Sequence, residues 1–285
     1  RRYRICFSLR YQDSKNCRKT KVKRLKLKID DSLYISDNSK ECDAKTLFLS
    51  SKNSSKYIED AMKNGAKGAI SASELRNYID IEGVKVVGVT GTNGKTTTTA
   101  LIYSLLLDLG YKVALSGTRG FFINEKRVEE KSLTTVDLLS NYARIAQAKL
   151  KGCDYYVTEV SSHAIDQERL EGIDFELKVL TNITSGHLAY HKSLQNYVDT
   201  KNSFFGDEGL KLINKDEKKA KYNPKNAYTY SIEESASFSL RAYRLSPRLE
   251  GVIEFGSSSA CFDSNMLGKF NLSNIVASVA AVELV

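Results

Sequence analysis

Short apolar runs alternate with stretches of helical periodicity along most of the chain. The apolar runs, which are typical of buried strands, are residues 47–49, 68–70, 84–89, 111–115, 155–160 and 177–183. The stretches in which apolar residues recur every three to four positions are residues 57–64, a segment that ends near Gly110, and residues 136–150 and 194–205. This alternation predicts an α/β fold whose mostly parallel sheet is flanked by helices on both faces. Ligand sites are then expected at the carboxyl ends of the strands.

The pattern is interrupted near Glu82 and Gly83, which predicts two domains. Residues 29–83 contain a strand, a helix and a second strand, and we expect them to form a small N-terminal α/β domain. Residues 84–285 are expected to form a larger central domain. In that domain, shorter alternating segments beyond Tyr228 predict a few antiparallel strands.

The net charge of +9 arises at the beginning of the chain. Residues 1–28 hold 12 of the 43 Lys and Arg side chains and one acid, Asp13, so the rest carries 31 basic and 33 acidic side chains. A local basic excess is found in arms that bind nucleic acid and also in solvated chain ends. Because this basic, atypical segment has no groove-reading or stacking motif, we favour a solvated chain end and expect no nucleic-acid partner.

The cysteines and the hydropathy pattern indicate a reducing compartment. The five cysteines are far apart and form no C-x-x-C pair, which argues against a disulfide framework or a zinc site. No apolar run reaches the roughly 18 residues of a membrane span, and the first residues lack the apolar core of a secretory signal. We therefore expect a cytoplasmic protein without a membrane partner.

The strongest chemical signal follows the apolar run 84–89 and is the sequence Gly91-Thr92-Asn93-Gly94-Lys95-Thr96-Thr97. Glycines allow backbone N–H groups to surround phosphate oxygens, and the helix that follows directs its positive end at the same anion. Lys95 would contact the terminal phosphates of ATP or GTP, and the Thr96 hydroxyl would ligate Mg²⁺. The usual P-loop has glycine where Val89 stands, so this is a variant loop in which Gly91 supplies the flexibility. The alternative is a tight strand-to-helix turn with a chance lysine.

Glu159 stands near the end of the apolar run 155–160, where a magnesium-binding carboxylate is needed. The alternative for this residue is an acid that caps the next turn. The three histidines of the chain, His163, His187 and His191, all lie near predicted strand ends. We therefore expect Glu159 and His187 to converge on one metal at the carboxyl edge of the sheet.

These motifs resemble those of the Mur ligase family. The matching sequences are G-T-N-G-K-T-T, E-V-S-S-H-A, T-N-I-T-S-G-H-L-A-Y-H and Y-V-D-T-K. Within the family, the form S-S-H-A-x-x-Q-x-R at residues 161–169 resembles the ligases that add the third amino acid to UDP-N-acetylmuramoyl-L-alanyl-D-glutamate in peptidoglycan precursor synthesis. The resemblance covers about residues 36–285 and does not extend to residues 1–28.

The resemblance implies an ATP-dependent amide ligation. ATP phosphorylates the terminal carboxylate of the substrate, and the amine of meso-diaminopimelate or L-lysine then displaces phosphate from the acyl phosphate. Lys95 would hold the phosphates, and Thr96 and Glu159 would bind the first magnesium ion. His187 would bind a second metal together with a carbamylated Lys201, because carbon dioxide turns the lysine cation into an anion with two metal-binding oxygens. Position alone would make Lys201 a solvated helix lysine.

The resemblance also implies which residues contact the two nucleotides. Those expected at the UDP-linked substrate are Thr134, Thr135, Ser161, Gln167 and Arg169 of the central domain and Ser39 of the small domain. An arginine suits a diphosphate or a carboxylate because its fork donates two parallel hydrogen bonds. The residues expected at ATP are Gly91, Thr92, Asn93, Gly94, Lys95, Thr96, Thr97 and Asn274. Asn274 matches the position that contacts adenine, with a helix cap as the alternative.

The chain departs from the family pattern D-H-L-D-Y-H, because Gly186 and Ala189 stand in place of both aspartates. Groups beside a metal-binding histidine commonly orient it, and their loss costs about 10–100-fold. We therefore expect Gly186 to weaken metal binding or turnover by roughly one to a few orders of magnitude, a loss that aspartate should reverse. Val136 stands where the family often has proline, and Asn38 and Lys40 stand where aspartate and arginine are usual.

Family members carry a further C-terminal domain that recognises the incoming amino acid, and none of these 285 residues matches it. We therefore expect this chain alone to bind its ligands weakly and to catalyse little. We expect a monomer of the bacterial cytoplasm. Three alternatives stay open. The first is another Mur-fold amide ligase, such as folylpolyglutamate synthetase or the ligase that adds the terminal dipeptide. The second is a catalytically weakened, nucleotide-binding regulatory module, and the third is a nucleic-acid-binding P-loop ATPase.

Overall fold

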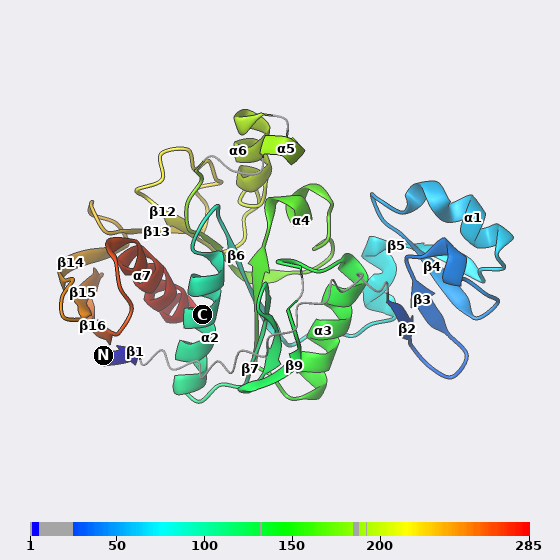
Figure 1. The fold of residues 1–285 in the computed structure, drawn as a ribbon, viewed down its shortest axis with the longest axis horizontal. Coiled ribbons are helices and arrows are strands. Elements are labelled where there is room, and N and C mark those ends of the chain that lie inside the picture. Colours follow the sequence, from blue (N-terminus) through cyan, green and yellow to red (C-terminus); the bar gives the residue numbers. More distant parts are fainter. Residues whose placement is uncertain (1, 6–24, 132, 185–187, 192) are drawn as a thin grey trace.

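The computed structural model describes residues 2–5, 25–131, 133–184, 188–191 and 193–285. In this part of the chain two β-sheets with their helices lie side by side (Figure 1). The smaller sheet has four strands and the larger sheet has twelve, which confirms the predicted α/β fold. None of the helices described has the length and apolar character that a membrane crossing requires.

The smaller sheet is formed by residues 26–71, in the strand order β2-β3-β4-β5. Its strands are β2 (Lys26–Lys28), β3 (Tyr34–Ser36), β4 (Thr46–Ser50) and β5 (Gly68–Ser71). Helix α1 (Ile58–Lys63) connects β4 to β5, and 3-10 helices occupy Ser39–Glu41, Ser55–Tyr57 and Ala72–Asn77. The strands predicted at residues 47–49 and 68–70 and the helix predicted at residues 57–64 are therefore confirmed.

Strand β2 lies inside the segment that was predicted to be an atypical, solvated chain end. It pairs antiparallel with β3, and Leu27 packs against the buried core while Lys26 forms an ion pair with Asp43 at 2.7 Å. The alternation of lysine and leucine thus suits a strand with one solvated face. The small sheet begins at Lys26 rather than at residue 29.

The larger sheet has the strand order β1-β16-β15-β14-β13-β12-β11-β6-β10-β7-β8-β9. Its strands are β1 (Arg2–Ile5), β6 (Lys85–Thr90), β7 (Val113–Gly117), β8 (Gly120–Ile123), β9 (Lys126–Glu129), β10 (Tyr155–Val160), β11 (Phe175–Leu180), β12 (Lys211–Asn214), β13 (Ala227–Ser231), β14 (Phe238–Arg244), β15 (Leu249–Phe255) and β16 (Ser258–Ser264). From β14 to β7 every neighbouring pair is parallel, whereas β14–β15, β15–β16, β7–β8 and β8–β9 are antiparallel. The prediction of a mostly parallel sheet with a few antiparallel strands is confirmed.

Helices cover both faces of the larger sheet because its central strands are apolar on both faces. In β6, Val87 and Val89 pack in the core that contains α2 (Lys95–Asp108) and α7 (Lys269–Leu284). Val86, which points to the opposite face, packs in the core that contains α3 (Leu138–Leu150). Three short helices, α4 (Ser162–Asp166), α5 (Leu188–His191) and α6 (Leu194–Ser203), follow the carboxyl ends of β10 and β11 and lie together at one edge of the sheet (Figure 1).

One apolar core joins the small unit to the larger one. Ile35, Leu49 and Leu75 of the small unit belong to the same buried cluster as Leu139 and Tyr142 of α3. The two units are therefore packed against each other by the hydrophobic effect as well as by polar contacts.

Arg76 provides the polar part of this contact. Its Nε donates to the Gly172 carbonyl at 2.6 Å, and a terminal nitrogen donates to the Asp174 carboxylate at 2.6 Å. These bonds join the 3-10 helix Ala72–Asn77 to the loop that precedes β11.

Some boundaries differ from those predicted. The strand predicted at residues 177–183 ends at Leu180, because Thr181 turns its hydroxyl to the Asn93 carbonyl at 2.7 Å. The strand predicted from residue 111 begins at Val113. The hairpin β8–β9 was not predicted because its turn, Asn124-Glu125, adopts positive φ angles of 44° and 69° without the glycine that usually signals such a turn.

Candidate active site

The phosphate loop connects the carboxyl end of β6 to α2 and depends on two glycines. Gly91 has a φ of +153°, and a side chain there would overlap the Thr181 hydroxyl. Gly94 has a φ of +82° at the N-terminus of α2, and a side chain there would overlap the Asn274 amide. Both positions therefore require glycine, for conformational and for steric reasons.

The end of β11 holds the phosphate loop in place. The Thr92 N–H donates to the Asn182 carbonyl at 2.8 Å, and the Asn93 N–H donates to the Asn182 side-chain oxygen at 2.9 Å. The Thr181 hydroxyl bond to Asn93 adds a third contact. Neither Thr181 nor Asn182 was selected from the sequence, since nothing in it shows that β11 lies beside β6.

Lys95 lies at the first turn of α2 with its ammonium group inside the loop. The Nζ atom donates to the Gly91 carbonyl at 2.7 Å and to the Thr92 carbonyl at 2.9 Å. Burial lowers the pKa of Lys95, and the nearby Glu159 carboxylate opposes that shift. A lysine at the positive end of a helix and next to loop N–H groups can balance the charge of a polyphosphate.

Glu159 occupies a cradle of neutral donors at the end of β10 and is only 2% exposed. The Thr96 hydroxyl donates to Glu159 Oε2 at 2.9 Å, and the Thr118 N–H donates to Oε1 at 2.8 Å. The Thr118 hydroxyl lies 3.2 Å from Oε2. A side chain at Gly117 would overlap the carboxylate, so this glycine makes room for it. Glu159 caps no helix, because Ser161 is the N-cap of α4.

Thr118 is a site residue that the sequence did not reveal. It follows β7, which pairs with β10 in parallel register from Val113 to Ser116. The only signal was a Gly-Thr pair after a predicted apolar strand. That strand had no known neighbour until the sheet order placed it beside β10.

The oxygen atoms around Glu159 suit a hard divalent cation. A buried carboxylate next to a threonine hydroxyl and a phosphate loop is the donor set that Mg²⁺ prefers in proteins. No group of three or more His, Cys, Asp or Glu residues that could hold a metal ion occurs in the part of the chain that the structure describes. Gly186 and His187, the predicted second-metal residue, lie outside that part, as does the side chain of Ala189.

Lys201 of α6 is buried beside the phosphate loop and is 1% exposed, so it is not a solvated helix lysine. Its Nζ donates to the Gly91 carbonyl at 2.9 Å and lies 3.5 Å from the Thr90 hydroxyl. Burial and, to a smaller extent, the positive charge of Lys95 lower the pKa of Lys201 to about 7. A substantial fraction of this amine is therefore uncharged at neutral pH.

Thr135 joins the predicted substrate residues to the backbone of Glu159. Its hydroxyl donates to the Glu159 carbonyl at 2.9 Å and accepts from the Ser161 N–H at 2.9 Å. Thr134 accepts from the Thr118 hydroxyl at 3.2 Å. The predicted ATP and UDP-substrate residues thus meet at Glu159. Its carboxylate accepts from Thr96 of the ATP set, and its backbone carbonyl accepts from Thr135 of the UDP-substrate set.

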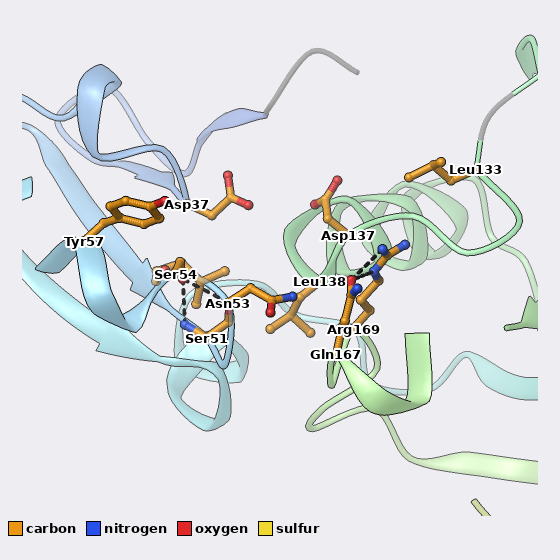
Figure 2. A pocket seen from close by; sticks show the side chains of 11 residues that line it. Asp37, Ser51, Asn53, Ser54, Tyr57, Leu133, Asp137, Leu138, Gln167 and Arg169 are labelled. Carbon is orange, nitrogen blue, oxygen red and sulfur yellow. Dashed lines mark hydrogen bonds between the residues drawn. The ribbon is translucent and has the colours of Figure 1, made fainter. Parts of the chain in front are cut away.

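Gln167 and Arg169 line a pocket of about 220 Å³ between the two units (Figure 2). The small unit contributes Asp37, Leu49, Ser51, Asn53, Ser54 and Tyr57, and the larger unit contributes Leu133, Asp137, Leu138, Gln167 and Arg169. Ser39 is buried in its 3-10 helix and is not among the lining residues, whereas Asp37 is. Thr134, Thr135 and Ser161 are not among the lining residues, but the Thr135 carbonyl accepts a hydrogen bond from Arg169 at 2.7 Å.

Asn274 lies in α7 beside the phosphate loop, six residues after Gly268, the N-cap of that helix, so it is not a helix cap. Its side-chain oxygen accepts from the Thr98 hydroxyl at 3.3 Å, and its Nδ2 donates to Asn271 at 3.0 Å. The structure therefore brings Asn274 to the base of the loop, 179 residues away in sequence from Lys95.

Comparisons with known proteins agree on one family. The sequence profile of the Mur ligase middle domain matches residues 89–282. The chain is 53% identical, over 253 residues, to the UDP-N-acetylmuramoyl-L-alanyl-D-glutamate–2,6-diaminopimelate ligase of Wolinella succinogenes, covering 89% of this chain and 58% of that protein. It is 46% identical to the enzyme of the same name from Helicobacter pylori, with coverage of 88% and 58%.

Solved structures show the same fold. A UDP-N-acetylmuramoyl-L-alanyl-D-glutamate–2,6-diaminopimelate ligase superposes with a TM-score of 0.75 at 27% identity, over 87% of this chain and 59% of that one. A MurF ligase from Thermotoga maritima in complex with ADP superposes with a TM-score of 0.54 at 19% identity, over 88% and 63%. The chain spans a little under three fifths of the length of these two curated relatives.

Proposed function

Since the chain belongs to the Mur ligase family, we propose that it serves in an ATP-dependent ligase that adds 2,6-diaminopimelate to UDP-N-acetylmuramoyl-L-alanyl-D-glutamate. The observation that carries this proposal is the double use of Glu159. Its carboxylate faces the phosphate loop, and its carbonyl holds Thr135 of the predicted substrate set. A substrate carboxylate and the terminal phosphate of ATP would therefore meet at one residue.

In this proposal, Lys95 exchanges the Gly91 and Thr92 carbonyls for the phosphates of ATP. Thr96 and Glu159 would hold a magnesium ion, which neutralises phosphate charge during transfer to the substrate carboxylate. Positioning and charge neutralisation are the main requirements of phosphoryl transfer, and the short, glycine-dependent loop meets the first of them. The amine of the incoming amino acid then attacks the acyl phosphate and displaces inorganic phosphate.

Lys201 is proposed to carry a carbamate. Its amine is deprotonated in a substantial fraction of molecules near pH 7 and can add to carbon dioxide, with loss of a proton, to form an N–C bond. The product would carry one negative charge shared by two oxygens, at the end of a buried side chain that lies beside the phosphate loop. This supports a role in metal binding, in which His187 would take part.

The substrate is tested by titration calorimetry of UDP-N-acetylmuramoyl-L-alanyl-D-glutamate, with the UDP-muramoyl-tripeptide and a folate as comparison ligands. Selective binding of the dipeptide nucleotide, weakened but still measurable in Arg169→Ala and unchanged in the exposed control Arg241→Ala, is the expected result. If ATP binds but no UDP-sugar does, the ligase proposal fails. The acceptor is tested by phosphate release from the ligase polypeptide that contains this sequence, which should occur with meso-diaminopimelate and not with L-lysine.

A further inference from the structure

The direction of the Arg169 side chain is set by one amide oxygen. Arg169 donates from Nε at 3.0 Å and from a terminal nitrogen at 2.6 Å to Gln167 Oε1, and from its other terminal nitrogen to the Thr135 carbonyl at 2.7 Å. Figure 2 shows Gln167 and Arg169 side by side at the wall of the pocket. Two bonds that converge on one acceptor atom fix the plane of a guanidinium more firmly than a single bond does.

The Tyr190 hydroxyl in turn sets the direction of Gln167. The Gln167 amide nitrogen donates to the Tyr190 hydroxyl at 3.0 Å, and that hydroxyl donates to Asp166 Oδ2 at 2.7 Å. An amide must present its oxygen to the guanidinium and its nitrogen to an acceptor, and the tyrosine oxygen is that acceptor. The chain of bonds therefore runs Asp166, Tyr190, Gln167, Arg169.

Tyr190 is itself fixed by the elements around it. Its ring packs on the His163 ring of α4 with centroids 4.0 Å apart. The next residue, His191, lies 2.9 Å from the Ser162 hydroxyl, and its ring packs against Tyr197 of α6 at 5.2 Å. Helix α5 is thus attached to α4 and α6, so the tyrosine hydroxyl has a defined place.

We propose that Tyr190 is a positioning residue, which holds Gln167 and through it aims the Arg169 fork into the pocket for an anionic group of the substrate. This inference rests on the proposed function for the identity of that group. It does not make Tyr190 a ligand, because the tyrosine acts through Gln167. The Arg169 plane is fixed before the ligand arrives, which lowers the ordering cost of binding.

Tyr190→Phe is the variant that tests this inference, because it keeps the ring on His163 and removes only the hydroxyl. The dissociation constant for UDP-N-acetylmuramoyl-L-alanyl-D-glutamate should rise about 3- to 10-fold, the usual effect of one lost hydrogen bond, while that for MgATP stays unchanged. The control is Tyr243→Phe, an exposed tyrosine of β14, the strand that Figure 1 shows on the side of the larger sheet away from the small unit; this variant should bind like the parent. Equal affinities of Tyr190→Phe and the parent would overturn the inference.

A double-mutant cycle separates positioning from general weakening of the fold. In an Arg169→Ala background, Tyr190→Phe should have no further effect on the dissociation constant of the UDP-linked substrate, because the guanidinium that Tyr190 positions is absent. If the two effects multiply instead, the tyrosine does not act through the arginine and the inference is wrong.

A measurement without ligand distinguishes failure of this inference from failure of the proposed function. In ¹⁵N-labelled protein, the Gln167 side-chain amide resonance, identified by its loss in Gln167→Ala, should shift and exchange with solvent faster in Tyr190→Phe. An unchanged resonance refutes the positioning role even if the UDP-linked substrate binds. A changed resonance in a protein that binds no UDP-sugar supports the positioning and refutes the proposed ligand.

Discussion

Lys201 places an ionisable amine in a buried site, and its replacement by methionine tests what that burial costs. The pKa of this amine falls from 10.5 to about 7 on folding. The unfolded chain therefore holds the proton more tightly, and the folded state gains stability as pH rises from about 7 toward 10.5. Integrated between pH 7 and pH 9, these two values give roughly 2 kcal/mol of added stability for the parent protein.

Urea unfolding at pH 7, 8 and 9, in buffers freed of carbon dioxide, measures this quantity. Other groups also titrate over the range, so the relevant number is the free energy of unfolding of the parent minus that of Lys201→Met. That difference should increase by roughly 2 kcal/mol from pH 7 to pH 9. The exposed control Lys126→Met, on β9, should show no such trend. A difference that does not change with pH would refute the argument from burial.

The same amine gives a spectroscopic test of carbamate formation. With ¹³C-bicarbonate, the parent protein should show a carbamate carbon signal that is absent in Lys201→Met. The signal should weaken below about pH 7, because the protonated amine cannot attack carbon dioxide.

Glu159→Gln keeps the shape of the side chain but removes the charge, so magnesium should no longer strengthen ATP binding. In calorimetry, we expect the affinity for ATP to fall about 10–100-fold with Mg²⁺ and to change little with EDTA. Gly94→Ala places a methyl group against the Asn274 amide at a φ of +82°. ATP binding should be abolished, and the free energy of unfolding should fall by about 1–3 kcal/mol. Normal ATP binding would contradict the steric argument. Arg76→Met removes the bonds to Gly172 and Asp174. Because the ion pair is partly solvated, the free energy of unfolding in urea should fall by only about 1 kcal/mol. A fall of more than about 3 kcal/mol would show that Arg76 stabilises the fold through further interactions.

Much of the fold was predictable because buried strands and phosphate loops have local signatures. The apolar runs at 84–89 and 155–160 became β6 and β10, and the glycines of the loop are required by its positive φ angles and close packing. The hairpin turn at Asn124-Glu125 was missed because its conformation comes from the strands on either side, not from residue preference.

The parts of the candidate site that depend on strand order could not be predicted from the sequence. Thr118 and Asn182 reach Glu159 and the phosphate loop because β7 lies beside β10 and β11 lies beside β6, and no local pattern encodes those neighbours. The resemblance to known ligases selected Lys201, but its burial and its lowered pKa follow only from the packing of α6 over the loop.

The core shared by the small unit and α3 has a consequence for how the protein unfolds. Ile35, Leu49 and Leu75 belong to the same buried cluster as Leu139 and Tyr142, so separating the units would expose apolar surface on both. The two sheets are separate in strand order, but the two units share one buried cluster. Heat or denaturant should melt both units in a single cooperative transition, so the pocket that both of them line should persist until that transition and disappear with it.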